Sequence, residues 1–196
     1  MVSKTGLKKY QQRRNLKESG EPAARKKSSA KSLIFVIQKH ASSHLHYDFR
    51  LEIDGVLKSW AVPKGPSLDP RVKRLALPTD DHPYDYATFE GVIPEGNYGA
   101  GTVMVWDKGT YKNIKEKDGT LVPLSTCYDN GHLEFFLKGK KLKGAFTLVR
   151  TGEGNGERWL LIKMRDEYAD ARRNPVSSEP DSAKTGRSMK EIEQVG

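Results

Sequence analysis

The sequence predicts a mainly β protein, folded as a compact antiparallel β-barrel with short flanking helices and a basic N-terminal arm. Seven or eight short runs rich in β-branched and aromatic residues recur along the 196-residue chain. Turn residues such as Gly, Pro and Asn separate these runs, which is typical of all-β proteins. The intervals leave little room for the crossover helices that parallel strands require. Together these observations favour an antiparallel barrel or sandwich.

The predicted strand at 44–53 has the clearest pattern, because its polar and apolar residues alternate without a break. Side chains on a strand point alternately to its two faces. One face is therefore apolar, and the other carries two imidazoles, carboxylates and a guanidinium. A continuous apolar run predicts the preceding strand at 33–39. The dipeptide Asp54-Gly55 predicts a hairpin turn into a return strand at 56–62.

Five further strands are predicted downstream. They lie at 73–77, 102–107, 133–137, 142–150 and 159–163. A short helix is expected at 86–89, with Asp81 as its cap. The glycine-rich stretch at 91–101 predicts a long ordered loop or a set of tight turns.

The domain organisation follows from length and composition. A chain of 196 residues suffices for one domain with a proper core and tails, but not for two ordinary domains. We expect a β-barrel domain at 33–166. The polar residues 1–32 are expected to form a basic, partly mobile arm, and residues 167–196 a poorly ordered tail.

The charge is concentrated at the N-terminus. The whole chain has a formal net charge of +9, and residues 1–32 contain 10 Lys or Arg against 2 Asp or Glu. Lys and Arg displace the counterions condensed on phosphates, so a basic arm suits a polyanion such as nucleic acid.

The sequence also excludes several classes of protein. Its single cysteine, Cys127, rules out an intramolecular disulfide and a cysteine-rich zinc site. No apolar run approaches the ~20 residues that span a bilayer, and the N-terminus lacks the apolar core of a secretory signal. We therefore expect a cytoplasmic protein without a membrane partner.

His40, His46 and Asp48 are candidate ligands of a divalent metal. His46 and Asp48 stand two residues apart on one strand, so their side chains lie side by side. His40 ends the preceding strand and comes within reach if the two strands pair. Three nitrogen and oxygen donors leave positions open for water and substrate. This donor set suits Mn²⁺, Fe²⁺, Zn²⁺ or Co²⁺ better than Ca²⁺ or Mg²⁺.

Arg50 follows Asp48 on the same face, and its planar fork suits an anionic substrate such as a phosphate. His82, which precedes the rigid Pro83, is a candidate phosphate ligand or general acid. We expect His46→Ala or Asp48→Ala to abolish activity without unfolding the protein, because residues on a polar face contribute little to the core.

Two other functions are compatible with these residues. One is a 2-His-1-carboxylate iron oxygenase that uses His46 and Asp48 with His132 as the third ligand. The other is a non-catalytic nucleic-acid-binding barrel that uses the basic arm.

Longer motifs point to a known family. The segments are FVIQKH at 35–40, HLHYDFRLE at 44–52, LKSWAVPKGP at 57–66, DHP at 81–83, FEGVIPEG at 89–96, YGAG at 98–101 and WLLIK at 159–163. Together they closely resemble the 3′-phosphoesterase domain of the bacterial multifunctional DNA ligase D, from about residue 10 to residue 166.

The resemblance implies a compact β-barrel and a Mn²⁺-dependent enzyme acting on 3′ ends of DNA or of RNA/DNA primer-templates. Co²⁺ or Zn²⁺ are further candidates for the site. A phosphodiesterase step would remove a terminal ribonucleoside, and a phosphomonoesterase step would remove the remaining 3′-phosphate, leaving a ligatable 3′-OH. We expect a free-standing version, with a separate ATP-dependent DNA ligase as its partner.

The resemblance also assigns roles to residues. The metal ligands would be His40, His46 and Asp48, and Arg50 and His82 would be the catalytic residues that hold the phosphate. The other residues implied to bind substrate or phosphate are Arg14, Glu21, Lys64, Arg74, Asp80 and Tyr86. Two positions depart from the family pattern. Asn15 stands where the family has Asp, which bears on the diesterase step, and Asp80 stands where it often has Glu.

Overall fold

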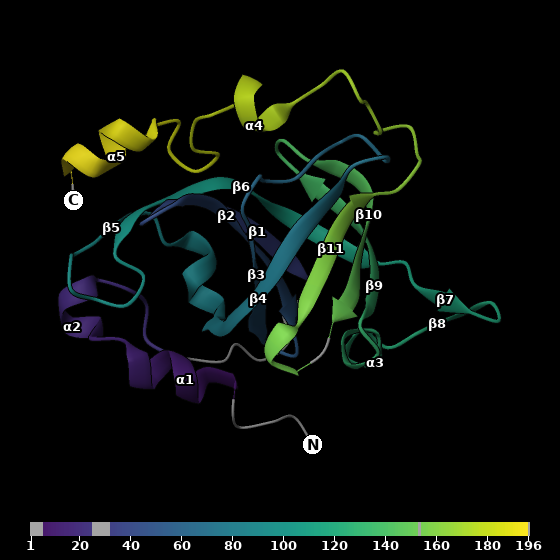
Figure 1. The fold of residues 1–196 in the computed structure, drawn as a ribbon, viewed down its shortest axis with the longest axis horizontal. Helices are drawn as coiled ribbons and strands as arrows, with labels where there is room; N and C mark the ends of the chain where they lie inside the picture. Colours follow the sequence, from purple (N-terminus) through teal and green to yellow (C-terminus); the bar gives the residue numbers. More distant parts are fainter. Residues whose placement is uncertain (1–5, 25–31, 153, 196) are drawn as a thin grey trace.

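The computed structural model describes residues 6–24, 32–152 and 154–195. Eight strands close into an antiparallel barrel in the order β1, β2, β3, β4, β11, β10, β9 and β6, and β6 pairs back to β1 (Figure 1). A short strand, β5, pairs with β6, and β7 and β8 form a separate hairpin. The mainly β class and the antiparallel barrel predicted from the sequence are confirmed.

The elements have the following bounds. The barrel strands are β1 Ile34–Ala41, β2 Leu45–Ile53, β3 Val56–Val62, β4 Lys73–Pro83, β6 Gly101–Asn113, β9 His132–Gly139, β10 Lys143–Gly152 and β11 Arg158–Lys163. The additional strands are β5 Gly91–Ile93, β7 Glu116–Lys117 and β8 Thr120–Leu121. The helices and helical turns are α1 Gly6–Arg13, α2 Leu16–Ser19, η1 Tyr84–Thr88, α3 Leu124–Asp129, η2 Gly154–Gly156, α4 Pro175–Ser178 and α5 Met189–Val195. Among the helices in the described residues, none is both long and apolar enough to cross a membrane.

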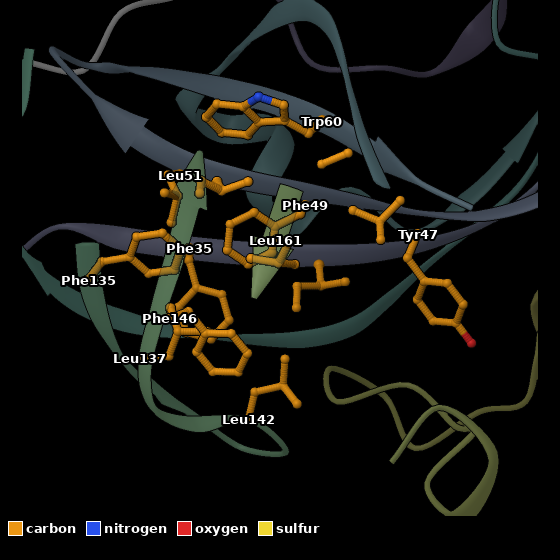
Figure 2. Close-up of a cluster of buried hydrophobic side chains, with 14 of the residues drawn as sticks. Phe35, Tyr47, Phe49, Leu51, Trp60, Phe135, Leu137, Leu142, Phe146 and Leu161 are labelled. Carbon is orange, nitrogen blue, oxygen red and sulfur yellow. The ribbon is translucent and has the colours of Figure 1, made fainter. Parts of the chain in front are cut away.

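The barrel interior is filled by the apolar face of the alternating strand. On β2, Tyr47, Phe49 and Leu51 are each at most 3% exposed. Figure 2 shows the ring of Phe49 among other apolar side chains of the core, including Phe35 and Phe135. Burying a large apolar side chain contributes roughly 1.5–3 kcal/mol. This interior packing fixes the register of β2 and so aims its polar side chains outward.

A second apolar cluster covers the outside of the barrel. It joins Tyr10 of α1 and Tyr86 of η1 to Val36, Leu57 and Val105 of the barrel strands. Both faces of β2 are therefore largely buried, and its polar face does not lie open to water along its length. The described part of the basic arm, residues 6–24, docks on the barrel, and α1 packs against β4. Residues 1–5 and 25–31 of the predicted arm lie outside the described residues.

The segment after β3 differs from the prediction in two ways. Strand β4 runs to Pro83 rather than ending at residue 77. The helical turn η1 then starts after Pro83, whose φ of −65° suits a helix start. Asp81 does not cap this turn, and its carboxylate instead pairs with Lys58 Nζ at 2.7 Å. Helix α3 and the β7–β8 hairpin have no counterpart in the sequence-based expectation.

The C-terminal segment is ordered against the barrel, contrary to the expected poorly ordered tail. The indole nitrogen of Trp106 donates to the Glu179 carbonyl at 2.9 Å, and Lys141 Nζ donates to the same carbonyl at 2.8 Å. The Ser182 hydroxyl donates to the buried carboxylate of Glu90 at 2.6 Å. A polar composition suggested disorder, but these specific donors on the barrel hold the tail.

Candidate active site

Three candidate metal ligands meet on the outer face of β1 and β2. The strands pair antiparallel, with His40 opposite His46, so the two imidazoles converge with Asp48 on one face. His40 Nδ1 lies 3.6 Å from Asp48 Oδ2, and His46 Nε2 lies 3.5 Å from Asp48 Oδ1. Two ligands at about 2.1 Å from a tetrahedral ion are themselves about 3.4 Å apart. The spacing therefore matches that of atoms sharing one cation.

The opposite nitrogen of each imidazole is held by the backbone. His40 Nε2 lies 3.0 Å from the Gly99 carbonyl, and His46 Nδ1 lies 2.9 Å from the His44 carbonyl. A carbonyl only accepts, so each of these nitrogens carries the proton and donates. His40 Nδ1 and His46 Nε2 face the Asp48 carboxylate, where each would offer its lone pair to a bound cation. Metal-binding histidines characteristically donate their other N–H in this way, so these residues fit a divalent metal.

The loop that holds His40 requires glycine. Gly101 has a φ of +133°, and a Cβ there would lie 2.1 Å from the Ala41 carbonyl oxygen. Only glycine permits this approach of β6 to the end of β1. The glycine-rich loop predicted at 91–101 therefore also positions His40, because it supplies the Gly99 carbonyl that accepts from His40 Nε2.

Asp48 is ionised despite being only 6% exposed. Burial alone raises the pKa of its carboxyl group. The Arg50 guanidinium and the two imidazoles outweigh burial, so the pKa lies below its ordinary value. Arg50 Nη2 donates to Asp48 Oδ2 at 3.0 Å.

Arg50 is held within the barrel wall by Asp48 and Gln38, and His82 lies beside it. Its Nε donates to Gln38 Oε1 at 2.7 Å, and its Nη1 lies 2.9 Å from His82 Nδ1. Gln38 is fully buried and donates its amide to the Tyr86 and Phe89 carbonyls. A guanidinium has five N–H donors, so at least two remain for an anion.

His82 reaches this face through an irregularity in β4. The β3–β4 register shifts between Leu57, opposite His82, and Ser59, opposite Thr79. Regular alternation would place Thr79 and His82 on opposite faces, but the extra residue lets both line one cavity. Bulges of this kind often re-aim side chains beside active sites.

The His82 imidazole is neutral in the free protein. Burial lowers its pKa well below the ordinary value, and the charges of Arg50 and Arg14 lower it further. Nδ1 lies 2.8 Å from the Asp80 carbonyl and Nε2 lies 3.0 Å from Arg14 Nη2. The tautomer that satisfies both contacts donates from Nδ1 to the carbonyl and accepts at Nε2. The nearby Arg50 Nη1 is then a cationic neighbour rather than a hydrogen-bond partner.

The N-terminal arm closes one side of the site. Tyr10 of α1 is fully buried, and its ring packs edge-on against His82 with the ring centroids 5.3 Å apart. Arg14 Nε donates to Glu21 Oε1 at 3.0 Å. Arg14 Nη1 and Glu21 Oε2 are buried without a hydrogen-bond partner. One donor and one acceptor of the arm are thus unpaired, in two residues that line the same cavity.

A cavity of about 200 Å³ joins these groups. The sequence-predicted residues that line it are Arg14, Glu21, His40, His46, Asp48, Arg50, Asp80, His82 and Tyr86. Lys64 and Arg74 are not among its lining residues. Lys64 is exposed after β3, and Arg74 lies opposite Leu161 near the start of β4. The structure therefore does not place these two beside the other candidates.

Sequence reasoning missed several residues of the site. Gln38 stands two residues before His40 on β1, so strand alternation could have placed both on the same face. Tyr10 gave no signal, because it lies in a polar arm. Tyr98 also lines the cavity, but its glycine-rich setting indicates only turns of the backbone.

The third ligand of the oxygenase alternative lies elsewhere. His132 begins β9 and pairs with Glu134, with 2.9 Å between His132 Nε2 and Glu134 Oε1. Across the described residues, the close group of potential metal ligands consists of His40, His46 and Asp48. The arrangement needed for that alternative is therefore absent there.

Comparisons with known proteins identify the family of this chain. Residues 38–150 match the family model of the DNA Ligase D 3′-phosphoesterase domain. The chain is 46% identical over 194 residues to the multifunctional non-homologous end joining protein LigD of Pseudomonas aeruginosa, an alignment covering 96% of this chain and 22% of the relative. It is 42% identical over 162 residues to the multifunctional non-homologous end joining DNA repair protein LigD of Mycobacterium tuberculosis, covering 82% and 20%. For LigD of Mycolicibacterium smegmatis the identity is 39% over 163 residues, covering 82% and 21%.

The chain thus spans about a fifth of the length of the curated relatives that it matches. The family match covers more than half of the chain and includes His40, His46, Asp48, Arg50 and His82. This chain belongs to the DNA Ligase D 3′-phosphoesterase domain family.

Proposed function

We propose that this chain is a metal-dependent phosphoesterase that heals DNA 3′ ends, removing 3′-terminal ribonucleosides and 3′-phosphates to leave a ligatable 3′-OH. One observation carries the proposal: the His40–His46–Asp48 group, Arg50 and His82 all open onto a single cavity. Hydrolysis of a phosphate ester needs stabilisation of the charge that develops on the phosphoryl oxygens. Family membership supports the same reaction class.

We propose Mn²⁺ as the native metal, held by His40 Nδ1, His46 Nε2 and the Asp48 carboxylate, with Co²⁺ or Zn²⁺ as substitutes. Two imidazoles and one carboxylate are a donor set that such ions accept. A bound divalent metal supplies Lewis-acid polarisation of a phosphoryl oxygen and lowers the pKa of water.

The chain's own residues would bind and orient the phosphate. Arg50 has N–H groups to spare and stands beside Asp48 on the same strand, so it can hold phosphoryl oxygens. In the phosphomonoesterase step, a water oxygen bonds to phosphorus and the bond from phosphorus to the 3′ oxygen breaks. In the phosphodiesterase step, the bond that breaks joins phosphorus to the 5′ oxygen of the terminal ribonucleoside, so the phosphate stays on the 3′ end. In both steps the water leaves a hydroxyl on phosphorus and releases one proton, and the leaving oxygen takes up a proton. His82 is the group we assign to that proton. A phosphate dianion would oppose the charges of Arg50 and Arg14 that lower the His82 pKa, and so favour its protonated form.

The arm would serve the diesterase step. Arg14 and Glu21 line the cavity, and Arg14 Nη1 and Glu21 Oε2 are buried without a hydrogen-bond partner. We propose that both side chains turn toward a bound terminal ribonucleoside and hydrogen-bond its hydroxyl. Asn15 is exposed and does not line the cavity. We therefore assign the diesterase contacts to Arg14 and Glu21. We assign no contact with the terminal phosphate to Lys64 or Arg74, because neither lines the cavity.

The relatives' names support a setting as well as a reaction. They describe non-homologous end joining and DNA repair proteins. We propose that this chain acts on DNA ends in the cytoplasm and hands its 3′-OH product to a separate ATP-dependent DNA ligase.

A labelled primer-template with a 3′-phosphate, or with a single 3′-terminal ribonucleotide, tests the function. With Mn²⁺ we expect the phosphate and the ribonucleoside to be released, and with EDTA we expect neither. Binding of the ends without release would instead indicate a non-catalytic barrel. Release that continues in EDTA would contradict the proposed dependence on a metal.

A further inference from the structure

Tyr98 is an exposed aromatic residue at the rim of the cavity. It lies in the loop between β5 and β6, and 47% of its surface is exposed. Most aromatic side chains of the described residues are buried, and the other large exposed aromatic, Tyr168, packs edge-on against Phe136. An exposed ring that also lines a cavity is available for contact with a ligand.

Two arginines of the arm lie close to the Tyr98 ring, and Arg13 Nη1 also donates to its hydroxyl oxygen at 3.4 Å. The guanidinium carbons of Arg13 and Arg14 lie 5.3 and 5.1 Å from its centroid. Arg13 Nη1 also donates to Asp80 at 3.0 Å, and its side chain is 48% exposed. Figure 1 shows the arm that carries α1 and α2 on the same side of the barrel as the β5–β6 loop. The ring is therefore oriented by two cations, one of which can also reach a phosphate.

The loop ties Tyr98 to the metal site. The next residue is Gly99, whose carbonyl accepts from His40 Nε2 at 3.0 Å. Backbone hydrogen bonds from Asn97 to the Pro94 carbonyl and from Ala100 to the Asn97 carbonyl close successive turns around Tyr98. The position of the ring is thus fixed relative to a metal ligand rather than left to a loose loop.

We propose that Tyr98 forms a base-stacking subsite for the terminal nucleotide of the 3′ end, with Arg13 contacting a neighbouring phosphate. The inference rests on the proposed function, because it places the terminal phosphate between Arg50 and the metal ligands. Every base has a π face, so such a subsite accepts any sequence. The base that stacks on Tyr98 must have one face free of its neighbour in a duplex. The subsite therefore favours frayed or single-stranded 3′ ends as substrates.

The experiment compares two oligonucleotides that carry the same 3′-phosphate. In one the terminal nucleotide has a base, and in the other it is an abasic tetrahydrofuran. Stacking of one base on an aromatic residue is worth about 1–3 kcal/mol, which corresponds to about 5–150-fold in affinity. For a half-exposed ring we expect the lower part of this range, about 5–30-fold, as the preference of the wild-type protein for the substrate with a base.

Tyr98→Leu should raise KM for the substrate with a base by this factor and leave KM for the abasic substrate unchanged. Tyr98→Phe keeps the ring and should restore the preference. Tyr168→Leu, a matched exposed tyrosine away from the cavity, should not alter it. Equal losses on both substrates would show that Tyr98 only holds the loop or the arm, and no loss on either would equally overturn the subsite.

The same comparison in EDTA separates this inference from the proposed function. Equilibrium binding of the two oligonucleotides is then measured without turnover, by fluorescence anisotropy. A wild-type protein that releases no phosphate with Mn²⁺ but still prefers the end with a base refutes the enzyme and keeps the subsite. Phosphate release without any preference for the base supports the enzyme and refutes the subsite.

Discussion

His46→Ala should remove metal binding while leaving the barrel folded. The His46 side chain is 21% exposed, and it contacts the His44 carbonyl, Asp48 and the His40 ring, whose centroid lies 4.8 Å from its own. Losing one such hydrogen bond costs about 0.5–1.5 kcal/mol, a small part of the roughly 5–15 kcal/mol that stabilises an ordinary domain. Substituting a residue that only hydrogen-bonds to a metal ligand typically weakens metal affinity ~10–100-fold. Removing one of the three protein ligands themselves should weaken it by more than this.

Asp48→Ala is expected to cost more stability than His46→Ala, because this part of the polar face is buried. The side chain of Asp48 is 8% exposed and that of its partner Arg50 only 3%. Removing one partner of a buried ion pair costs about 3–5 kcal/mol, because the other charge stays buried and unpaired. Arg50 keeps its contact with Gln38, so we expect the lower end, ~3 kcal/mol. His46→Ala is therefore the cleaner test of the metal.

Urea unfolding with Mn²⁺ and with EDTA measures both effects. At a metal concentration 100 times its Kd, the wild-type protein should gain about 2.7 kcal/mol of stability. If His46→Ala weakens binding 100-fold, the gain at the same concentration falls to about 0.4 kcal/mol. Isothermal titration calorimetry gives the Kd independently. A His46→Ala protein that keeps the full gain would refute the assignment of His46 as a ligand.

Four further substitutions follow from the site and the tail. Below pH 6.5 the unfolded chain binds a proton at His82 that the buried imidazole of the folded protein does not bind, so the unfolding free energy of the wild-type protein falls by up to ~1.4 kcal/mol per pH unit. His82→Gln removes this group and should make that fall less steep. Gln38→Leu should lower kcat about tenfold or more and cost at least ~2 kcal/mol of stability, because Arg50 Nε and two carbonyls lose their partner. Glu21→Gln should reduce ribonucleoside removal more than phosphate removal. Glu90→Gln should loosen the tail by about 1–3 kcal/mol, since its carboxylate accepts from Ser182 and Thr185, without changing phosphate release.

The readouts for these variants are separate. Urea unfolding at pH 7.5 and 5.5 checks His82→Gln, and a slope equal to that of the wild-type protein would contradict the proposed neutral imidazole. Steady-state kinetics with each substrate checks Gln38→Leu and Glu21→Gln. Unchanged kcat for the former would count against Gln38 as the residue that positions Arg50, and equal losses of both activities for the latter would count against a diesterase contact by Glu21. Limited proteolysis checks Glu90→Gln, and undiminished protection of residues 179–187 would contradict the tail contacts.

Much of the site was predictable from strand alternation. The period-two pattern of 44–53 placed His46, Asp48 and Arg50 on one face, and antiparallel pairing brought His40 opposite His46. What the pattern could not show is that the polar face is also covered. The polar composition of the arm suggested mobility, yet Tyr10 packs fully buried against His82.

The remaining differences have local physical causes. Alternation cannot foresee the extra residue in β4, so only the structure explains why Thr79 and His82 share the cavity. Proximity in sequence to a functional motif does not ensure proximity in space, as Lys64 and Arg74 illustrate. The composition of the tail does not predict its order, because that order depends on donors such as Trp106 and Lys141, which are distant in sequence.

The most direct test of the central claim is an anomalous difference map from crystals of this protein soaked in Mn²⁺. We predict a single strong peak within bonding distance of His40 Nδ1, His46 Nε2 and a carboxylate oxygen of Asp48, with the Gly99 and His44 carbonyls still holding the opposite ring nitrogens. A peak bound elsewhere, or a peak reached only after either imidazole flips, would contradict the account.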